Sequence, residues 1–143
     1  MKFFWRLTAL CFAILVIQSA PASAQSSVFG NWVTESGNAL VAITRCGSEI
    51  CGRVSRVLVR TPDQDQRDVN NPNPVLRDRP IEGLRILSGF RRDGDQYRHG
   101  QIYDPESGRS YSARLRVNRN GSLRVTGCAL GGLICQSQTW ARR

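Results

Sequence analysis

The chain has 143 residues, of which 41% are hydrophobic and 22% charged, and its formal net charge is +9. This length excludes more than one domain of ordinary size, and the chain shows no internal repeat and no low-complexity tract. It contains a single histidine, which leaves few residues from which a catalytic acid–base set could be built.

Residues 1–24 have the three parts of a secretory signal peptide. Lys2 and Arg6 give a positive start, the segment 7–17 is a short apolar run, and Ala22-Ser23-Ala24 is a small-residue cleavage site. The apolar run is shorter than the roughly 20 residues that span a bilayer, which argues against a membrane anchor. We therefore predict cleavage after Ala24 and a periplasmic or secreted bacterial protein, residues 25–143, with one domain and no transmembrane segment.

The predicted mature chain is strongly basic, and all of its cations are arginines. Cleavage removes Lys2 and Arg6 and no acid, so 18 of the 20 basic residues remain against all 11 acidic ones, a net charge of +7. Such a balance favours acidic partners such as lipid headgroups, polyanionic glycans or nucleic acid, although arginines also simply keep strand faces soluble.

After the signal peptide the sequence predicts eight strands and no helix of useful length. Apolar alternation and turn residues place the strands at 28–35, 39–45, 50–59, 85–92, 96–103, 110–118, 123–128 and 134–142. A meander of about eight short strands removes its exposed edges by closing into a barrel. The prediction is an all-β, antiparallel up-and-down barrel whose interior is filled by side chains or holds one small ligand.

Four cysteines follow the signal peptide, and we predict that they form two disulfides. Cys128 and Cys135 are equidistant from Gly131-Gly132, which favours a two-residue hairpin turn and places the two cysteines opposite each other. Cys46 and Cys51 flank another short loop that contains a glycine. The alternative is a zinc site of four thiolates, which an oxidising compartment disfavours.

The segment 61–83 is predicted to be a long loop. Pro72, Pro74 and Pro80 each remove a backbone donor, and the Asn and Asp residues around them favour turns. A compact domain seldom carries so long a connection without a use for it.

Several motifs resemble the secreted bacterial family catalogued as domain of unknown function 2147. They are Gly30-x-Trp32, Cys46 with Cys51-Gly52, Asn71-Pro72-x-Pro74-x-Leu76-Arg77-x-Arg79-Pro80-x-x-Gly83-Leu84, Gly100-x-Ile102-Tyr103-Asp104-Pro105-x-x-Gly108-x-x-Tyr111, and Thr139-Trp140-x-Arg142. The resemblance covers essentially the whole predicted mature chain and implies a lipocalin-like barrel with no settled activity. One departure is His99, which stands where the family pattern usually has a second glycine.

The two ends of the domain also resemble lipocalins in general. In that fold an early Trp closes the barrel floor and a late Arg packs across its ring. The resemblance therefore implies structural roles for Trp32, Trp140 and Arg142, with the guanidinium of Arg142 over the Trp32 ring.

The candidate ligand-binding residues fall into two sets. In a regular strand Tyr97, His99, Gln101 and Tyr103 share one face, and Tyr111 follows on the next strand, which suits a pocket with a few polar groups. The alternative is that this face is turned to solvent. In the long loop the candidates are Asp68, Asn71, Asn73, Arg77 and Arg79, where paired guanidinium groups can hold a carboxylate or a phosphate. The alternative is that these side chains serve the loop's own backbone.

We expect the barrel to bind a small-molecule or lipid-like ligand that is partly apolar or anionic, without a cofactor or a metal. One alternative is an envelope or polyanion binder that uses the arginines 85, 91, 92, 114, 116 and 124. The less favoured alternative is a hydrolase, in which His99 would need a serine such as Ser110 or Ser112 and an acid such as Asp104. No nucleophile-elbow pattern, phosphate-binding loop or metal motif supports it, so we predict no catalytic residues and no nucleic-acid partner.

Overall fold

The computed structural model describes residues 27–143. The predicted signal peptide and its cleavage site lie outside the described residues. The strands are β1 (Gly30–Val33), β2 (Ala39–Cys46), β3 (Glu49–Val57), β4 (Arg85–Asp93), β5 (Gln96–Asp104), β6 (Arg109–Val117), β7 (Leu123–Ala129) and β8 (Ile134–Arg142), with short 3-10 turns η1 (Pro74–Leu76) and η2 (Leu130–Gly132).

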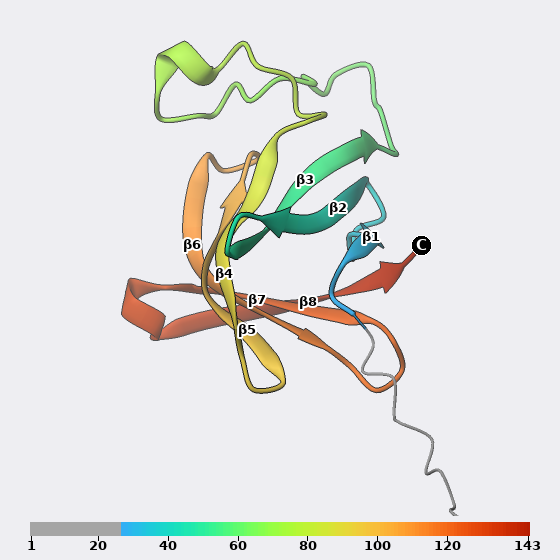
Figure 1. Cartoon of the computed structure of the whole chain (residues 1–143). Coiled ribbons are helices and arrows are strands. Elements are labelled where there is room, and N and C mark those ends of the chain that lie inside the picture. Colours follow the sequence, from blue (N-terminus) through green and yellow to red (C-terminus); the bar gives the residue numbers. More distant parts are fainter. Residues whose placement is uncertain (1–26) are drawn as a thin grey trace, which may run out of the picture.

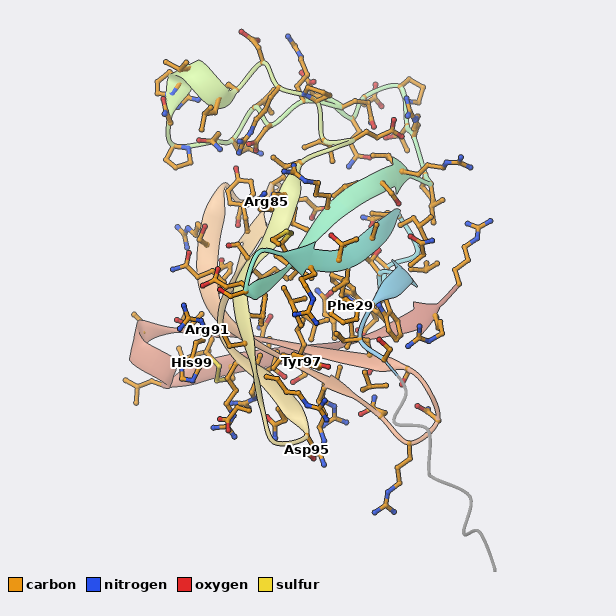
Figure 2. The ribbon with its side chains drawn as sticks, viewed as in Figure 1. Phe29, Arg85, Arg91, Asp95, Tyr97 and His99 are labelled. Carbon is orange, nitrogen blue, oxygen red and sulfur yellow. A yellow bond between two sulfur atoms is a disulfide. The ribbon has the colours of Figure 1, made fainter. Side chains whose placement is uncertain are left out.

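The strands form one closed antiparallel barrel, which confirms the predicted fold (Figure 1). Each strand pairs with its neighbour in sequence, and β8 returns to β1. The connections β1–β2, β3–β4, β5–β6 and β7–β8 therefore lie at one end, here called the loop end. The other three connections lie at the opposite end, here called the open end. Arg85 and Asp95, labelled in Figure 2, mark the loop end and the open end of the β4–β5 hairpin.

All eight strands agree with the predicted bounds to within two residues at each end, and β1 is shorter than predicted by two residues at both ends. The shortening has a local cause. The Thr34 hydroxyl donates to Asn38 Oδ1 at 2.9 Å, and the amide of Gly37 donates to the Thr34 carbonyl at 2.8 Å. A turn therefore begins where the sequence suggested a continuing strand.

Apolar side chains from all eight strands form one core inside the barrel. The alternation predicted for β6 is observed, since Ala113 and Leu115 are buried while Ser112, Arg114 and Arg116 are exposed. The largest fully buried side chains are Trp32, Trp140 and Phe90.

Two glycines allow large side chains to fill the interior. A Cβ at Gly100 would overlap the ring of Phe90, and a Cβ at Gly52 would lie 2.8 Å from Leu87 Cδ1. Any side chain larger than that of glycine at position 100 or 52 would take the space that Phe90 or Leu87 now fills. Of the two alternatives for the interior, the packing favours one filled by side chains.

The barrel closes through a short seam between β1 and β8. Only Trp32–Arg142 and Val33–Ala141 are paired across it. The guanidinium of Arg142 lies 4.2 Å from the centroid of the Trp32 ring, which is the contact that the resemblance implies. The same guanidinium donates to the carbonyls of Ser27 and Phe29. The Arg142 side chain therefore connects three features: the segment before β1, the seam between β1 and β8, and the buried ring of Trp32.

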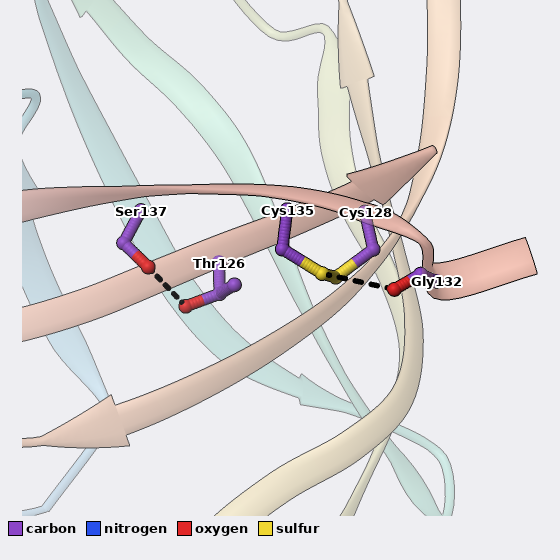
Figure 3. The surroundings of a disulfide bond; sticks show 5 residues. All are labelled: Thr126, Cys128, Gly132, Cys135 and Ser137. Carbon is purple, nitrogen blue, oxygen red and sulfur yellow. Dashed lines mark hydrogen bonds between the residues drawn. A yellow bond between two sulfur atoms is a disulfide. The ribbon is translucent and has the colours of Figure 1, made fainter. Parts of the chain in front are cut away.

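Both predicted disulfides are present, so the four cysteines are paired and do not converge on a metal. Cys128 and Cys135 are directly opposed in the β7–β8 ladder with a Cα–Cα distance of 4.1 Å (Figure 3). Cys46 and Cys51 join β2 to β3 with a Cα–Cα distance of 5.9 Å. The predicted two-residue turn at Gly131-Gly132 is wrong. Four residues, 130–133, connect the last pair Ala129–Ile134, although the turn is centred where the sequence placed it.

The predicted face of β5 is also wrong, because the strand is bulged at His99. Tyr97 pairs with Leu115 and Gly100 with Ala113, so three steps on β5 match two on β6. His99 has a φ of 63° and is exposed. The bulge reverses the alternation, so Tyr97 lies on the inner face with Gly100 and Ile102, while His99, Gln101 and Tyr103 lie on the outer face. Among the described residues, no helix is long and apolar enough to cross a membrane.

The conformation of His99 predicts a stabilising substitution. A φ of 63° is in the left-handed region, where a side chain costs about 1–2 kcal/mol, whereas glycine costs only backbone entropy. We expect His99→Gly to raise the free energy of unfolding by about 0.5–1 kcal/mol. Urea titration followed by tryptophan fluorescence measures this. His99→Ala is the control, because it keeps the penalty and should give no gain; equal effects of the two substitutions would contradict the explanation.

Candidate functional site

The long loop, residues 58–84, is folded back on itself and lies across the loop end of the barrel (Figure 1). Its two arms meet at an isolated bridge between Arg67 and Pro80. The amide of Asp68 donates to the Arg79 carbonyl at 3.0 Å, and the amide of Ile81 donates to the Gln66 carbonyl at 2.8 Å. These bonds bring residues that are more than ten positions apart in the sequence to the same place.

A fully buried carboxylate, Asp68, stands at the centre of this junction. Arg79 approaches one carboxylate oxygen with Nε at 2.9 Å and Nη2 at 2.8 Å. Asn71 Nδ2 donates to the same oxygen at 2.8 Å, and the Tyr103 hydroxyl donates to the other at 2.5 Å. A buried carboxylate is tolerated only when paired and hydrogen-bonded in this way. Asp68 thus joins both arms of the loop to β5 of the barrel.

Tyr103 lies on the outer face of β5, but its ring is partly buried where the loop meets the strand. Burial, together with the hydrogen bond to the Asp68 carboxylate, raises the pKa of Tyr103 to about 12. The phenol therefore stays protonated well above neutral pH and acts as a fixed hydrogen-bond donor to Asp68.

The remaining loop candidates surround this junction and are also engaged within the loop. Arg77 Nε donates to the Asn71 carbonyl at 2.7 Å. Asn73 Oδ1 accepts from the amide of Val75 at 3.1 Å and so caps η1, while the amide of Asn73 donates to Asn71 Oδ1 at 2.9 Å. The structure thus brings together Asp68, Asn71, Asn73, Arg77, Arg79 and Tyr103, and it leaves Tyr97, His99 and Tyr111 elsewhere on the barrel.

A second contact fixes the loop to the β5–β6 turn. Asn70 Nδ2 donates to the Glu106 carbonyl at 2.8 Å, and the Asn70 carbonyl lies directly over Gly108. Gly108 has a φ of 68°, and a Cβ there would overlap the Asn70 carbonyl oxygen. Asp104 shapes this turn by accepting from the amide of Glu106 at 3.0 Å and from the Ser107 hydroxyl at 2.6 Å. Asp104, the acid considered for a hydrolase, therefore serves the turn.

Two concavities lie outside the barrel interior, and sequence reasoning found neither as a site. One of about 530 Å³ is mostly apolar and is lined by residues 29–31 and 42–45, where the guanidinium of Arg45 lies 5.6 Å from the centroid of the Phe29 ring. The other, of about 540 Å³, is here called the arginine groove. It lies on the outer face of β5 to β8 and is lined by Gln96, Arg98, Arg114, Leu115, Arg116, Asn118, Arg124, Thr126 and Ser137. Only its arginines 114, 116 and 124 were among the predicted candidates.

Comparison with known proteins places the chain in a family. Residues 30–142 match the family described as uncharacterized protein conserved in bacteria (DUF2147). The chain belongs to this family. Its fold is similar to the solved structure of protein HP1028 from the human pathogen Helicobacter pylori, which is described as belonging to the lipocalin family. The TM-score is 0.71 at 24% identity, over 82% of this chain and 83% of that one. No curated protein matches the chain.

The contact between Gly108 and Asn70 predicts what holds the loop in place. Gly108→Ala adds a Cβ that must displace the Asn70 carbonyl, and it also forces alanine into a left-handed conformation. We therefore expect it to lower the free energy of unfolding by about 2–4 kcal/mol. Gly94→Ala is the matched control, because Gly94 has a similar φ of 61° with no atom within 4 Å of the added Cβ. It should cost only about 1–2 kcal/mol. Urea unfolding and limited proteolysis of residues 58–84 measure both effects, and equal losses would show that the loop does not depend on this contact.

The Tyr103 hydroxyl predicts a pH-dependent contribution to stability. Tyr103→Phe leaves a buried carboxylate oxygen without its donor, which should cost about 1.5–3 kcal/mol at neutral pH. Because the folded pKa lies above the unfolded value, the wild-type advantage is complete below about pH 10 and is lost as the pH rises toward about 12. Unfolding titrations across this range should show the two proteins converge. Tyr97→Phe, whose hydroxyl has no hydrogen-bond partner among the described residues, should cost little at any pH.

Proposed function

We propose that this protein is an exported, lipocalin-like barrel that binds a small, partly apolar anion. The single observation that carries the proposal is the apolar concavity between the start of β1 and the end of β2, with Arg45 at its edge. Such a site combines an apolar wall with one cationic group, which suits a ligand that has a hydrocarbon part and an acidic head. The lipocalin-like fold and the two disulfides support the binding role and the export, respectively.

The position of this concavity explains how a filled barrel can still bind a ligand. Gly30 and Asn31 precede the residues of β1 that form ladder pairs with β8. On the seam side of this part of β1, the Asn31 carbonyl accepts from the amide of Arg143 at 3.0 Å. On the other side Gly30 and Asn31 pair with Ile43 and Ala42 of β2. Arg45 makes no ion pair with a carboxylate among the described residues, so its guanidinium is available to an acidic ligand. The interior behind this wall stays packed.

Contact between a ligand and the loop residues Asp68, Asn71, Asn73, Arg77 and Arg79 stays a prediction. Their mutual hydrogen bonds favour a role in holding the loop, since a ligand would have to replace partners that the protein already supplies. Contact between a ligand and Tyr97, His99 or Tyr111 also stays a prediction, and the bulge of β5 places Tyr97 and His99 on opposite faces of that strand.

The proposal is tested first by native mass spectrometry of protein purified gently from its own cell envelope. We expect a stoichiometric adduct that organic solvent removes, and the mass of the extract names the ligand class. Arg45→Gln should weaken rebinding of the extracted ligand about five- to ten-fold, because one charge-assisted contact is lost. Arg109→Gln, which removes an exposed arginine at the loop end, is the matched control and should leave binding unchanged. A bare mass from several gentle preparations, or equal effects of the two substitutions, would contradict the proposal.

A further inference from the structure

The outer half of the β7–β8 hairpin extends beyond the body of the barrel (Figure 1). Residues 134–139 of β8 are all exposed, so both faces of the strand are open to solvent there. In the barrel strands β2 to β7, by contrast, buried side chains interrupt the exposed ones. This part of the hairpin therefore contributes little to the core, and its composition needs another explanation.

The tip of this hairpin is apolar and uncharged. Leu130, Leu133 and Ile134 are 70%, 86% and 56% exposed, and no charged residue occurs between Arg124 and Arg142. The rest of the described chain is rich in arginine, so an uncharged stretch of this length is unusual for it. Exposed aliphatic side chains gathered at one projecting point are typical of a surface that is covered by something else.

The tip is held on a stiff support. The disulfide between Cys128 and Cys135 joins the two strands directly behind the turn, and the hydroxyls of Thr126 and Ser137, two residue pairs further back, lie 2.8 Å apart (Figure 3). Such cross-links lower the entropy that the tip would lose on being covered. The tip is therefore preorganised for contact.

The same outer face continues from the tip into the arginine groove. Arg124 is exposed between the buried Leu123 and Val125, and by strand alternation Arg124, Thr126 and Cys128 point to the outer face. Thr126 is buried there but lines the arginine groove. Arg114 is paired with Thr126 on the neighbouring strand, and Arg116 is paired with Arg124. Like charges directly opposite each other are destabilising without an anion between them.

The charge of the groove is only partly balanced by the protein. Arg116 contacts Asp95 at 2.6 Å, and Arg98 lies 3.5 Å from Asp93. Arg114 and Arg124 have no carboxylate partner within the part of the chain that the structure describes. The groove thus offers guanidinium groups to external anions next to an apolar, projecting tip.

We propose that this hairpin and groove dock onto a bilayer surface that contains anionic phospholipids. The three aliphatic side chains of the tip would enter the outer edge of the hydrocarbon layer, and Arg114 and Arg124 would bind lipid phosphates. The spacing agrees with this arrangement. Thr126, the partner of Arg114, is four positions from Leu130, or about 13 Å along a strand, and Arg124 is six positions away, or about 20 Å. When the tip enters by about 5–10 Å, Arg114 lies near the phosphates and Arg124 lies further out, at the headgroup surface. A second copy of the chain is a poorer occupant, because two cationic grooves would be brought together.

Co-sedimentation with vesicles tests the docking, using the predicted mature protein, residues 25–143. Vesicles of phosphatidylcholine with phosphatidylglycerol should bind the protein, and vesicles of phosphatidylcholine alone should bind it at least about five-fold more weakly. The double substitution Leu130→Asn with Leu133→Asn should weaken binding about ten-fold or more, because the inserted apolar area is lost. Val75→Asn is the matched control, since Val75 is also 86% exposed but lies in the long loop, and it should have no effect.

The arginines are tested separately in the same assay. Arg114→Gln with Arg124→Gln should weaken binding to the anionic vesicles about ten-fold or more and reduce its sensitivity to salt. Arg85→Gln, at the loop end of β4, should change it little (Figure 2). All variants should keep the wild-type unfolding midpoint, because the substituted side chains are exposed. The proposal is overturned if the anionic vesicles bind no better than the neutral ones, or if the leucine substitutions leave vesicle binding intact. It is also overturned if those substitutions only abolish self-association in vesicle-free solution.

Discussion

Closure of the barrel is the constraint on which the rest of this structure depends. Seven of the eight strand interfaces are ladders between neighbours in sequence, but the eighth joins the two ends of the domain through two residue pairs. So short a ladder is weak by itself, and the Arg142 guanidinium strengthens it by stacking on Trp32 and binding the carbonyls of Ser27 and Phe29. Once the seam is closed, the sheet has no free edge, and every strand has a fixed inner face.

A closed barrel of this size has a small interior, and here large side chains occupy it. Trp32, Phe90 and Trp140 are the largest fully buried side chains, and the ring of Phe90 takes the space that Gly100 leaves. For this reason we propose binding sites outside the interior, at the rim beside β1 and on the outer face of β5 to β8. The polar residues of the long loop are also used within the protein, because they bond to one another, to Tyr103 and to the β5–β6 turn.

The sequence predicted the strands well because each depends on local alternation and on turn residues that lie beside it. It predicted the Cys128–Cys135 disulfide because two cysteines at equal distances from a turn face each other. Cys46 and Cys51 are offset in their ladder, where Cys46 pairs with Glu49 and Cys51 with Thr44, and their short separation in sequence is what indicated the second disulfide. It failed for the face of β5, because period-two alternation assumes a regular strand, and β5 is bulged at His99. The role of Asp68 was likewise open, since its partners Arg79 and Tyr103 are 11 and 35 positions away. Both concavities combine residues from strands whose register no single segment of sequence reveals.

The motifs that carry the family resemblance gain a physical reading from these contacts. Asn71, Arg79, Tyr103, Asp104 and Gly108 all hold the loop against the barrel or shape the turn on which it rests. Residues of this kind maintain an architecture and say little about what it binds. The apolar tip of the β7–β8 hairpin and Arg114 and Arg124 beside it lie outside those motifs, and the packing of the barrel does not account for them. A property of this particular chain is therefore better sought on that outer face than in the loop by which the family is recognised.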